Sequence, residues 1–545
     1  MDGSDRLAVD RVEAGGFVWR VNRALRGDLA AWMDDPAGGL EAAAPRVIKR
    51  NSVRTVYFLR MGARDYYVKR YAGGGFLERL KARWGETKAA REWRVMRAGC
   101  EAGLPVPVPG ATGERWEGGR LVASYLATVA IADARDLVPH LEAYLRADRP
   151  ARHAFLRRLG AAVRRLHEAG LFHRDLHSGN VLVQRGADGA PVLHFIDLHR
   201  GSVRRRLGRR ARRWNLAFLL HSTSGVTDPD DRLEVLRGYA AAGGDGGGLG
   251  EVDAVARWVE RRILRFERRR LRSRTRRCLV DSSQFKRLRE PAGLLHVDRS
   301  FGAEAARAVL AAYREGAGVA ELKRTRRTRV AALDDPGGRP VVVKEYFARR
   351  LDRAGGGRGR AAWRAAHGLG VRGFPAARPL ACFTPRRGGG FVVMERARGV
   401  RLDHHVIARA AALGEGSRAF RAELDRVGRA VADLVRRLHE QGVYHGDLKA
   451  CNLFVALDGG AGAAALTLVD LDRVVFADRP LGRRRRIKNL AQLHAAVPTH
   501  VSRRARCRWF RRYASAAVYR ERRRYYEGVR RACARKLVVD REPIE

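Results

Sequence analysis

Closely spaced cysteine pairs are absent from this sequence. Its six cysteines stand far apart, at positions 100, 278, 382, 451, 507 and 533, and no two of them form a C-x-x-C pair. A disulfide framework or a structural zinc site needs cysteines at short, recurring spacings, so the sequence argues against both. We therefore expect reduced thiols in a cytoplasmic protein.

Long apolar runs are absent as well. No stretch approaches the ~18 consecutive apolar residues that a membrane-spanning helix needs. The first ten residues, MDGSDRLAVD, are acidic and contain no apolar core, so we expect no signal peptide. The sequence predicts a chain that is soluble or peripherally attached to a membrane, with no transmembrane segment.

Acidic residues and lysine are both scarce beside arginine. The chain has 59 Asp and Glu against 109 Lys and Arg, which gives a formal charge of +50, and only 10 of those basic residues are lysine. A charge of this size favours anionic partners such as phosphates, anionic lipid headgroups or nucleic acid. With 545 residues, of which 46% are hydrophobic, the chain is too long for one core, and two to four domains are expected.

One stretch dominates what the sequence does contain. Residues 173–197 read HRDLHSGNVLVQRGADGAPVLHFID: a His-x-Asp, an Asn five residues after that Asp, two short apolar runs and a final Asp. Phosphoryl transfer needs a carboxylate to take the proton of the attacking hydroxyl, and a second carboxylate with an amide to hold Mg²⁺. A loop carrying Asp175 and Asn180, followed by a β-hairpin ending at Asp197, would supply all three groups. This is the catalytic-loop and metal-loop pattern of the protein-kinase-like fold.

The plainer interpretation of this stretch is a buried turn in which Asp and Asn act as caps. A second copy argues against it. Residues 445–470 read HGDLKACNLFVALDGGAGAAALTLVD, with the same spacing from Asp447 to Asn452 and a final Asp470. A turn has no reason to repeat this set of side chains, so we interpret both copies as phosphoryl-transfer sites.

A lysine and a glutamate precede the first copy. Lys69 follows a β-rich run, and Glu92 lies on an expected helix over residues 88–99. A lysine at such a strand end can reach nucleotide phosphates, and a glutamate on the next helix can orient it. Each could also be an ordinary solvent-facing residue, but their order before His173 favours the functional interpretation. No G-x-G-x-x-G precedes Lys69. The corresponding segment, KRNSVRTV at 49–56, would have to cover phosphates with basic and hydroxyl groups.

The second half of the chain repeats the first. KRTRRTRV at 323–330 matches KRNSVRTV, Val343-Lys344 matches Val68-Lys69, and LGRRRRIKNLA at 481–491 matches LGRRARRWNLA at 207–217. These matches predict a tandem duplication. We place the first domain, with an N-terminal extension of short helices, at residues 1–275 and the second at 276–545.

The second copy differs at one expected site position. Glu92 in REWR aligns with Ala362 in AAWR, so Lys344 lacks the expected carboxylate partner. Glu345 is adjacent, but consecutive strand residues point to opposite faces, which makes it a poor substitute. The sequence therefore predicts that the first copy carries most of the turnover, while the second binds nucleotide and is slow or regulatory.

A basic helix is expected over residues 255–277, after a glycine-rich linker at 243–250. It could be a solvated, arginine-rich helix that ends the first domain. It could equally dock onto anionic membrane headgroups.

Several motifs together resemble the lipopolysaccharide core sugar kinases, the Kdo kinase and WaaP-type heptose kinase family, also known as InaA-like. They are the VKRY ending at Tyr71, REW at 91–93, HRDLHSGN, and above all FIDLHR at 195–200 in place of Asp-Phe-Gly. The resemblance implies an α+β, protein-kinase-like fold, present twice. It also implies an ATP-dependent and Mg²⁺-dependent kinase that phosphorylates a heptose or Kdo hydroxyl of the inner core at the cytoplasmic face of the inner membrane.

By role, the pattern and the resemblance assign nine residues. The catalytic bases would be Asp175 and Asp447, the nucleotide-binding residues Lys69, Glu92 and Lys344, and the metal ligands Asn180, Asp197, Asn452 and Asp470. His173 would brace the loop rather than react.

Three other interpretations stay open at this point. A small-molecule phosphotransferase of the aminoglycoside or choline type has the same H-x-D-x-x-x-x-N, but would favour an acidic pocket for a cationic acceptor. One or both copies could be pseudokinase scaffolds, and the missing glutamate makes this plausible for the second copy only. Non-specific nucleic-acid binding would explain the charge, and its salt dependence would reveal it, but it would not explain the repeated Asp–Asn–Asp spacing.

Overall fold

The computed structural model describes residues 7–42, 45–50, 54–72, 86–145, 148–243, 250–348, 357–386, 388–456 and 464–534. The chain divides into two compact units, residues 1–267 and 268–545. The domain boundary predicted between residues 275 and 276 lies eight residues after this division and stays a prediction.

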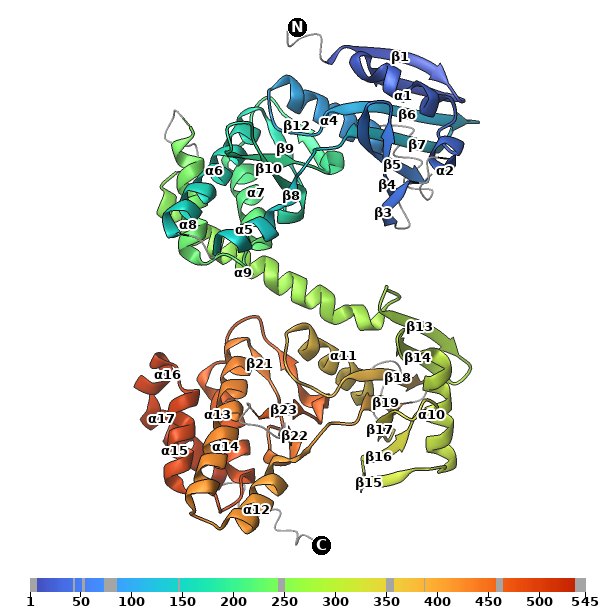
Figure 1. Ribbon diagram of the computed structural model, residues 1–545. Helices are drawn as coiled ribbons and strands as arrows, with labels where there is room; N and C mark the ends of the chain where they lie inside the picture. Colours follow the sequence, from blue (N-terminus) through green and yellow to red (C-terminus); the bar gives the residue numbers. More distant parts are fainter. Residues whose placement is uncertain are drawn as a thin grey trace. The chain divides into compact units, whose positions relative to one another are not determined.

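The first unit begins with an antiparallel sheet of seven strands in the order β1-β2-β6-β7-β5-β4-β3 (Figure 1). The strands are β1 Val9–Ala14, β2 Phe17–Asn22, β3 Arg46–Arg50, β4 Arg54–Met61, β5 Arg64–Ala72, β6 Pro109–Glu117 and β7 Arg120–Val129. Helix α1 (Arg26–Asp34), the short helix α2 (Gly38–Ala42) and helix α4 (Lys88–Glu101) complete this lobe. Thr87 caps the start of α4 by accepting a hydrogen bond from the backbone N–H of Ala90.

The N-terminal region corrects one expectation. We predicted an extension of short helices there; α1 and α2 are such helices, but residues 9–22 before them form a β-hairpin at the edge of the sheet. The reason is a period of two: Phe17, Trp19 and Val21 are buried while the residues between them are exposed. Gly113 on β6 lies so close to the Trp19 ring that a Cβ there would clash with it.

The second lobe of this unit is mainly helical. Its helices are α5 Leu137–Leu145, α6 Arg149–Glu168, α7 Arg209–Ser222, α8 Pro229–Ala241 and α9 Val252–Arg276. Strands β8 (Arg135–Asp136), β10 (Val181–Arg185) and β11 (Pro191–Phe195) form one small sheet, and β9 (Leu171–His173) pairs with β12 (Gly201–Val203). The expected hairpin after Asn180 is present as β10 and β11.

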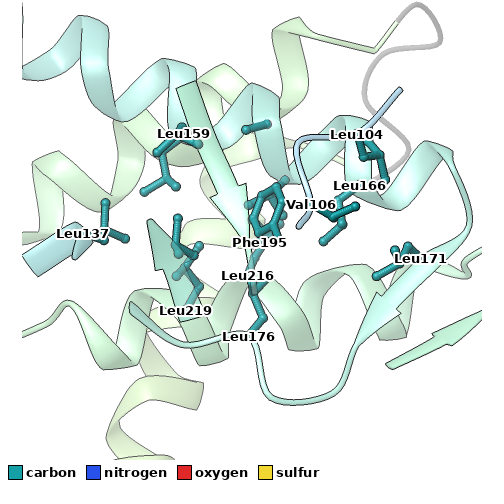
Figure 2. Close-up of a cluster of buried hydrophobic side chains, with 14 of the residues drawn as sticks. Leu104, Val106, Leu137, Leu159, Leu166, Leu171, Leu176, Phe195, Leu216 and Leu219 are labelled. Atoms are coloured by element: carbon teal, nitrogen blue, oxygen red, sulfur yellow. The ribbon is translucent and has the colours of Figure 1, made fainter. Parts of the chain in front are cut away.

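A single apolar cluster supports the loop between β9 and β10. Leu159 and Leu166 from α6, Phe195 from β11 and Leu216 from α7 are all buried in it (Figure 2). Helices α6 and α8 approach closely because Gly160 and Gly238 carry no Cβ, which on either residue would strike the backbone of the other helix. The loop and its hairpin therefore rest on a packed base.

The second unit repeats this plan. Its sheet has the order β13-β14-β18-β19-β17-β16-β15, the same order as in the first unit. Its strands are β13 Phe285–Glu290, β14 Gly293–Asp298, β15 Ala320–Arg324, β16 Thr328–Asp334, β17 Pro340–Tyr346, β18 Pro379–Pro385 and β19 Gly390–Glu395, accompanied by α10 Ala303–Glu315 and α11 Arg358–Val371. The repeat thus includes the hairpin and the helix that open the first unit.

The helical lobe of the second unit carries the second loop. Its helices are α12 Leu402–Leu413, α13 Arg418–Glu440, α14 Arg483–Ala496, α15 Arg503–Tyr513, α16 Ala516–Arg520 and α17 Arg522–Ala534, and its short strands are β20 Val400–Arg401, β21 Val443–Tyr444, β22 Leu453–Ala456, β23 Ala465–Leu468 and β24 Val475–Phe476. A β-rich lobe and a mainly helical lobe in each unit confirm the predicted α+β, protein-kinase-like fold, present in tandem.

Helix α9 is the basic helix expected from the sequence, and it is not simply solvated. Val255, Val259 and Ile263 are buried in the core of the first unit. Beyond the division, Thr275 is buried in the second unit and Arg272 forms an ion pair with Asp478. The apolar face is therefore used for packing. Within the described residues, no helix combines the length and the apolar character needed to span a membrane.

Candidate active site

The loop of the first unit is held by its own backbone and by His173. The Nε2 of His173 lies 3.0 Å from the carbonyl oxygen of Ile196, and its Nδ1 lies 3.3 Å from the backbone N–H of Asp175, which donates to it. These partners fit a neutral ring protonated on Nε2, and burial lowers the pKa of His173 to about 4. His173 therefore braces the loop and connects it to β11.

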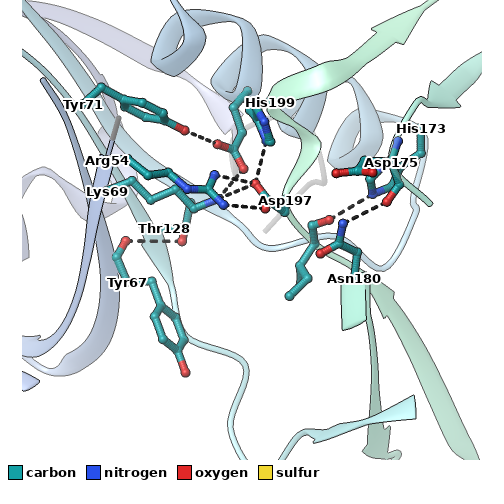
Figure 3. Close-up of polar contacts among 12 residues, drawn as sticks. Arg54, Tyr67, Lys69, Tyr71, Thr128, His173, Asp175, Asn180, Asp197 and His199 are labelled. Atoms are coloured by element: carbon teal, nitrogen blue, oxygen red, sulfur yellow. Dashed lines mark hydrogen bonds and ion pairs between the residues drawn. The ribbon is translucent and has the colours of Figure 1, made fainter. Parts of the chain in front are cut away.

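Asp175 and Asn180 lie on this loop as the spacing predicted. The side-chain nitrogen of Asn180 donates to the backbone carbonyl of Asp175 at 2.9 Å (Figure 3). That bond uses the amide nitrogen and leaves the amide oxygen of Asn180 available for the predicted metal role. In the described part of the chain, the Asp175 carboxylate has no hydrogen bond or ion pair. An unpartnered, ionisable oxygen on a braced loop is what a proton acceptor requires.

Asp197 follows β11 in the left-handed backbone region, with φ of 60°. A non-glycine residue in this region is under strain of about 1–3 kcal/mol, and such strain clusters at functional sites. Asp470 has the same conformation in the second unit, with φ of 58°. In both units the carboxylate in this conformation contacts a lysine of the sheet, Lys69 in the first and Lys344 in the second.

Four donor atoms reach the Asp197 carboxylate. Arg54 donates to both oxygens at 2.8 and 2.7 Å, His199 Nδ1 lies 2.7 Å from Oδ1, and Lys69 Nζ lies 3.3 Å from it (Figure 3). Burial alone would raise the pKa of Asp197. The hydrogen bonds from Arg54 and His199 and the charge of Lys69 outweigh burial and hold that pKa well below its usual range. Asp197 is therefore ionised at neutral pH.

Lys69 and Glu92 meet as the sequence predicted. Lys69 Nζ lies 2.5 Å from Glu92 Oε1, and the Tyr71 hydroxyl donates to Glu92 Oε2 at 2.8 Å. Glu92 is fully buried, so an ionised carboxylate there needs these two partners. Burial and the Glu92 charge raise the pKa of Tyr71 well above its usual value, which keeps its hydroxyl a donor.

The donor set of this site fits a hard divalent cation. One ligand atom each from Glu92, Asp197 and His199 lies within 4.8 Å of the others. Carboxylate and amide oxygens are what Mg²⁺ prefers, together with phosphate oxygens. Asp197 and Asn180 supply such oxygens, while Glu92 is occupied by Lys69. The predicted metal ligands therefore match the chemistry of the ion, and their role stays a prediction.

Sequence reasoning missed several supporting residues. The segments that we singled out contain Arg54, His199 and Tyr71, but no pattern in the neighbouring sequence predicted which residues they contact. Asn215 on α7 was missed as well. Its side-chain nitrogen donates to the carbonyl of His173 at 2.8 Å, and its oxygen lies 3.1 Å from His167 Nε2. A signal existed, because Asn-Leu-Ala recurs at the same place in both halves.

The His167 network leads to a pH prediction. Burial lowers the pKa of His167 to about 3, against 6.5 for a free ring, and His439 shows the same shift in the second unit. Between these pKa values the unfolded chain binds more protons than the folded chain, so the stability of the folded chain falls as the pH drops from about 6.5 toward 4. At pH 5 each of the two rings should lower the free energy of unfolding by about 2 kcal/mol relative to neutral pH.

Urea unfolding at pH 7 and pH 5 measures this effect. The variant His167→Gln should lose less stability on acidification than the wild-type chain, because its side chain does not titrate. His153→Gln, on the same helix but partly exposed, is the control and should behave as wild type. Equal acid losses in all three proteins would contradict the assignment.

The second unit has the same loop, with Asp447 and Asn452, but its lysine, Lys344, has different neighbours. Asn452 donates to the backbone carbonyl of Asp447 at 2.9 Å, as in the first unit. Lys344 forms its ion pair with Asp470. Ala362 is buried where the first unit has Glu92. Glu345 accepts a hydrogen bond from Tyr313 on α10, which confirms that it points away from Lys344.

Two further positions differ between the units. Arg54 pairs in register with Tyr71, and the residue that pairs with the matching Tyr346 is Thr328. His199 is replaced by Asp472, which is buried and forms an ion pair with Arg358. The second site therefore lacks the arginine and the histidine that hold the metal-loop carboxylate in the first.

Comparison with known proteins agrees with these observations. The family model described as "Lipopolysaccharide kinase (Kdo/WaaP) family" matches residues 33–239 and again residues 340–513. A 3-deoxy-D-manno-octulosonic acid kinase of Xanthomonas euvesicatoria is 31% identical over 179 residues, which cover 32% of this chain and 67% of that protein. The corresponding kinase of Vibrio parahaemolyticus is 26% identical over 135 residues, covering 24% of this chain and 54% of its own length.

These matches have defined limits. The chain spans about half the length of the two Vibrio kinases that it matches, 54% and 55%. A solved structure of WaaP in complex with acyl carrier protein is 26% identical, covers 44% of this chain and 95% of that chain, and has a TM-score of 0.35. Both halves of the present chain match one family, as the repeat predicted.

Proposed function

The chain belongs to the lipopolysaccharide kinase (Kdo/WaaP) family, and from that premise we propose that it is an ATP-dependent kinase of lipopolysaccharide. It would transfer the γ-phosphate to a hydroxyl of an inner-core sugar, a heptose or Kdo. The observation that supports this best is the first site itself. Among the described residues, the Asp175 carboxylate has no partner and stands on a braced loop, while Lys69 contacts both Glu92 and the ionised Asp197.

Each residue has a distinct task in this proposal. Bound ATP and Mg²⁺ would supply the phosphoryl group and neutralise its charge. Asp175 would accept the proton of the sugar hydroxyl as that oxygen bonds to the γ-phosphorus, while the bond from the γ-phosphorus to the β-phosphate oxygen breaks and ADP leaves. Asp197 and Asn180 would hold the metal, and Lys69, oriented by Glu92, would hold the phosphates. The site residues of the second unit, Lys344, Asp447, Asn452 and Asp470, take the corresponding tasks there.

Phosphate transfer to defined acceptors tests the proposal. Purified chain is incubated with ATP, Mg²⁺ and lipopolysaccharide whose inner core lacks phosphate, and mass spectrometry locates the added phosphate. We expect it on a heptose or Kdo. An aminoglycoside and choline serve as control acceptors. Phosphorylation of these alone, or ATP turnover without transfer to the core, would contradict the proposal. Loss of core phosphate in a deletion strain would identify the acceptor sugar.

The second unit has a separate proposed role, as a nucleotide-binding copy with slow turnover. Ala362 in place of Glu92 supports it. Lys344 has Asp470 as its ion-pair partner, and Asp470 is also the proposed metal ligand. When the metal takes Asp470, Lys344 is left without a carboxylate to orient it, whereas Lys69 keeps Glu92.

We also propose that the chain works peripherally at the cytoplasmic face of the inner membrane, with exposed arginines of α9 against anionic headgroups. Arg257, Arg261 and Arg265 follow one another at helical spacing and are exposed, and Leu264 beside them is 54% exposed. Each basic residue near an anionic surface contributes about 1 kcal/mol, so three contacts would hold the chain measurably.

Vesicle sedimentation tests the arginines of α9. The triple variant Arg257→Gln, Arg261→Gln and Arg265→Gln should bind anionic vesicles on the order of a hundredfold more weakly than the wild-type chain. The control replaces Arg11, Arg20 and Arg120, which are exposed on the first sheet, and so removes the same charge. Equal losses in both triple variants, or equal binding to neutral and anionic vesicles, would argue against α9 as the docking element.

A further inference from the structure

Arg54 contacts the carboxylate of Asp197, the proposed metal ligand. It is the first residue of β4, and its guanidinium contacts both oxygens of Asp197 in a two-pronged arrangement at 2.8 and 2.7 Å. The Arg54 side chain is only 12% exposed and the Asp197 side chain 19%. The hydrogen bond to Asp197 raises the pKa of Arg54, so the guanidinium stays charged. This pair is a shielded, charge-assisted contact rather than a surface ion pair.

Arg54 contacts both oxygens of the Asp197 carboxylate. A carboxylate offers about four lone-pair positions. Oδ1 accepts from Arg54, His199 and Lys69, whereas Oδ2 accepts from Arg54 alone. A divalent cation must approach a carboxylate oxygen to about 2.0–2.1 Å, which a hydrogen-bonded guanidinium prevents. A metal ion that binds Asp197 on the side covered by the guanidinium therefore requires Arg54 to leave.

Arg54 has a second partner of suitable shape when nucleotide binds. A guanidinium matches phosphate oxygens with the same two-pronged geometry that it uses for a carboxylate. Arg54 lies next to Lys69 across the β4–β5 pairing, where Val56 is opposite Lys69 and Arg54 is opposite Tyr71. It stands at the end of the segment that replaces the glycine-rich phosphate loop in this chain.

We propose that Arg54 is a positioning residue that exchanges partners. It holds Asp197 while the site is empty, and it turns to the nucleotide phosphates when the metal takes Asp197. The contact keeps Asp197 ionised and correctly oriented, and it makes metal binding depend on the arrival of phosphate. This inference rests on the proposed nucleotide and metal site of the first unit.

The second unit provides an internal comparison. Thr328 stands at the position of Arg54, opposite Tyr346, and Asp470 is held there by Lys344. Threonine is thus accepted by this fold at the start of the strand. Arg54→Thr removes the guanidinium without introducing a residue that the repeat does not already use.

The test measures two affinities that the exchange moves in opposite directions. All proteins carry Asp470→Ala, so that binding reports the first site. Mn²⁺ alone is titrated by electron paramagnetic resonance, and Mg-ADP by calorimetry. In Arg54→Thr we expect Mn²⁺ to bind about tenfold more tightly and Mg-ADP about tenfold more weakly. Arg54→Lys keeps the charge but not the two-pronged guanidinium, so both of its affinities should lie between those of the parent protein and those of Arg54→Thr. Arg70→Thr removes the same charge from an exposed neighbour on β5 and should change neither affinity.

Each other outcome has a distinct meaning. A purely structural role for Arg54 would weaken both affinities together, and that result would overturn the exchange. Normal Mg-ADP binding with unchanged Mn²⁺ affinity in Arg54→Thr would overturn the exchange alone and leave the proposed function standing. If the parent protein bound neither probe, the exchange would fall together with the proposed nucleotide site.

Discussion

The Asp175→Asn variant is expected to lose roughly 10²–10⁴-fold in turnover, the range that a positioned proton acceptor contributes. An amide cannot take the proton of the sugar hydroxyl. The fold should tolerate the change, because the loop is held through the backbone of Asp175 and not through its carboxylate. The measurement is turnover of purified protein on inner-core acceptor at saturating ATP.

Two companion measurements keep that result interpretable. Mg-ADP affinity and the thermal midpoint of Asp175→Asn should stay close to wild type, since the residue touches neither the Lys69–Glu92 pair nor the core. Asp188→Asn removes a carboxylate from the exposed turn of the neighbouring hairpin and should leave turnover unchanged. Near-normal turnover in Asp175→Asn would show that Asp175 is not the base and that another residue accepts the proton.

Much of the first site could be predicted because its parts are fixed by short spacings. Asp175 and Asn180 lie on one loop, and a two-strand hairpin leads to Asp197. The pairing of Lys69 with Glu92 followed from one strand and the next helix. In each case a known local geometry connects the residues, so spacing alone limits where the side chains go.

The remaining contacts depend on tertiary structure. Arg54 and Asp197 are 143 residues apart, and no local rule connects the start of one strand to the turn after another. Lys344 illustrates the same limit. Its missing glutamate was visible in the sequence, but its ion pair with Asp470 was not. The hairpin of residues 9–22 was misjudged for a different reason, because its buried positions alternate with a period of two while we assumed a helical period.

The last prediction compares the two units through their metal-loop carboxylates. Asp197→Ala should lower turnover on the inner-core acceptor on the order of a thousandfold, because a bound metal supplies several kcal/mol of transition-state stabilisation. Asp470→Ala should lower it by less than about threefold if the first unit performs the chemistry. The difference follows from the lysines. Lys69 keeps Glu92 and Tyr71 supports that glutamate, whereas the carboxylate that holds Lys344 is Asp470 itself.

We expect nucleotide binding to differ less between the two units than turnover does. A freed lysine has roughly 2 kcal/mol of rotamer entropy to lose before it can hold a phosphate, which slows the chemistry more than it weakens Mg-nucleotide binding through the remaining ligands. Calorimetry on the Asp197→Ala protein should therefore still detect one nucleotide site, and Asp470→Ala should abolish it in that background. If Asp470→Ala alone reduces turnover as much as Asp197→Ala does, the ranking is wrong, and the two units are either both catalytic or coupled.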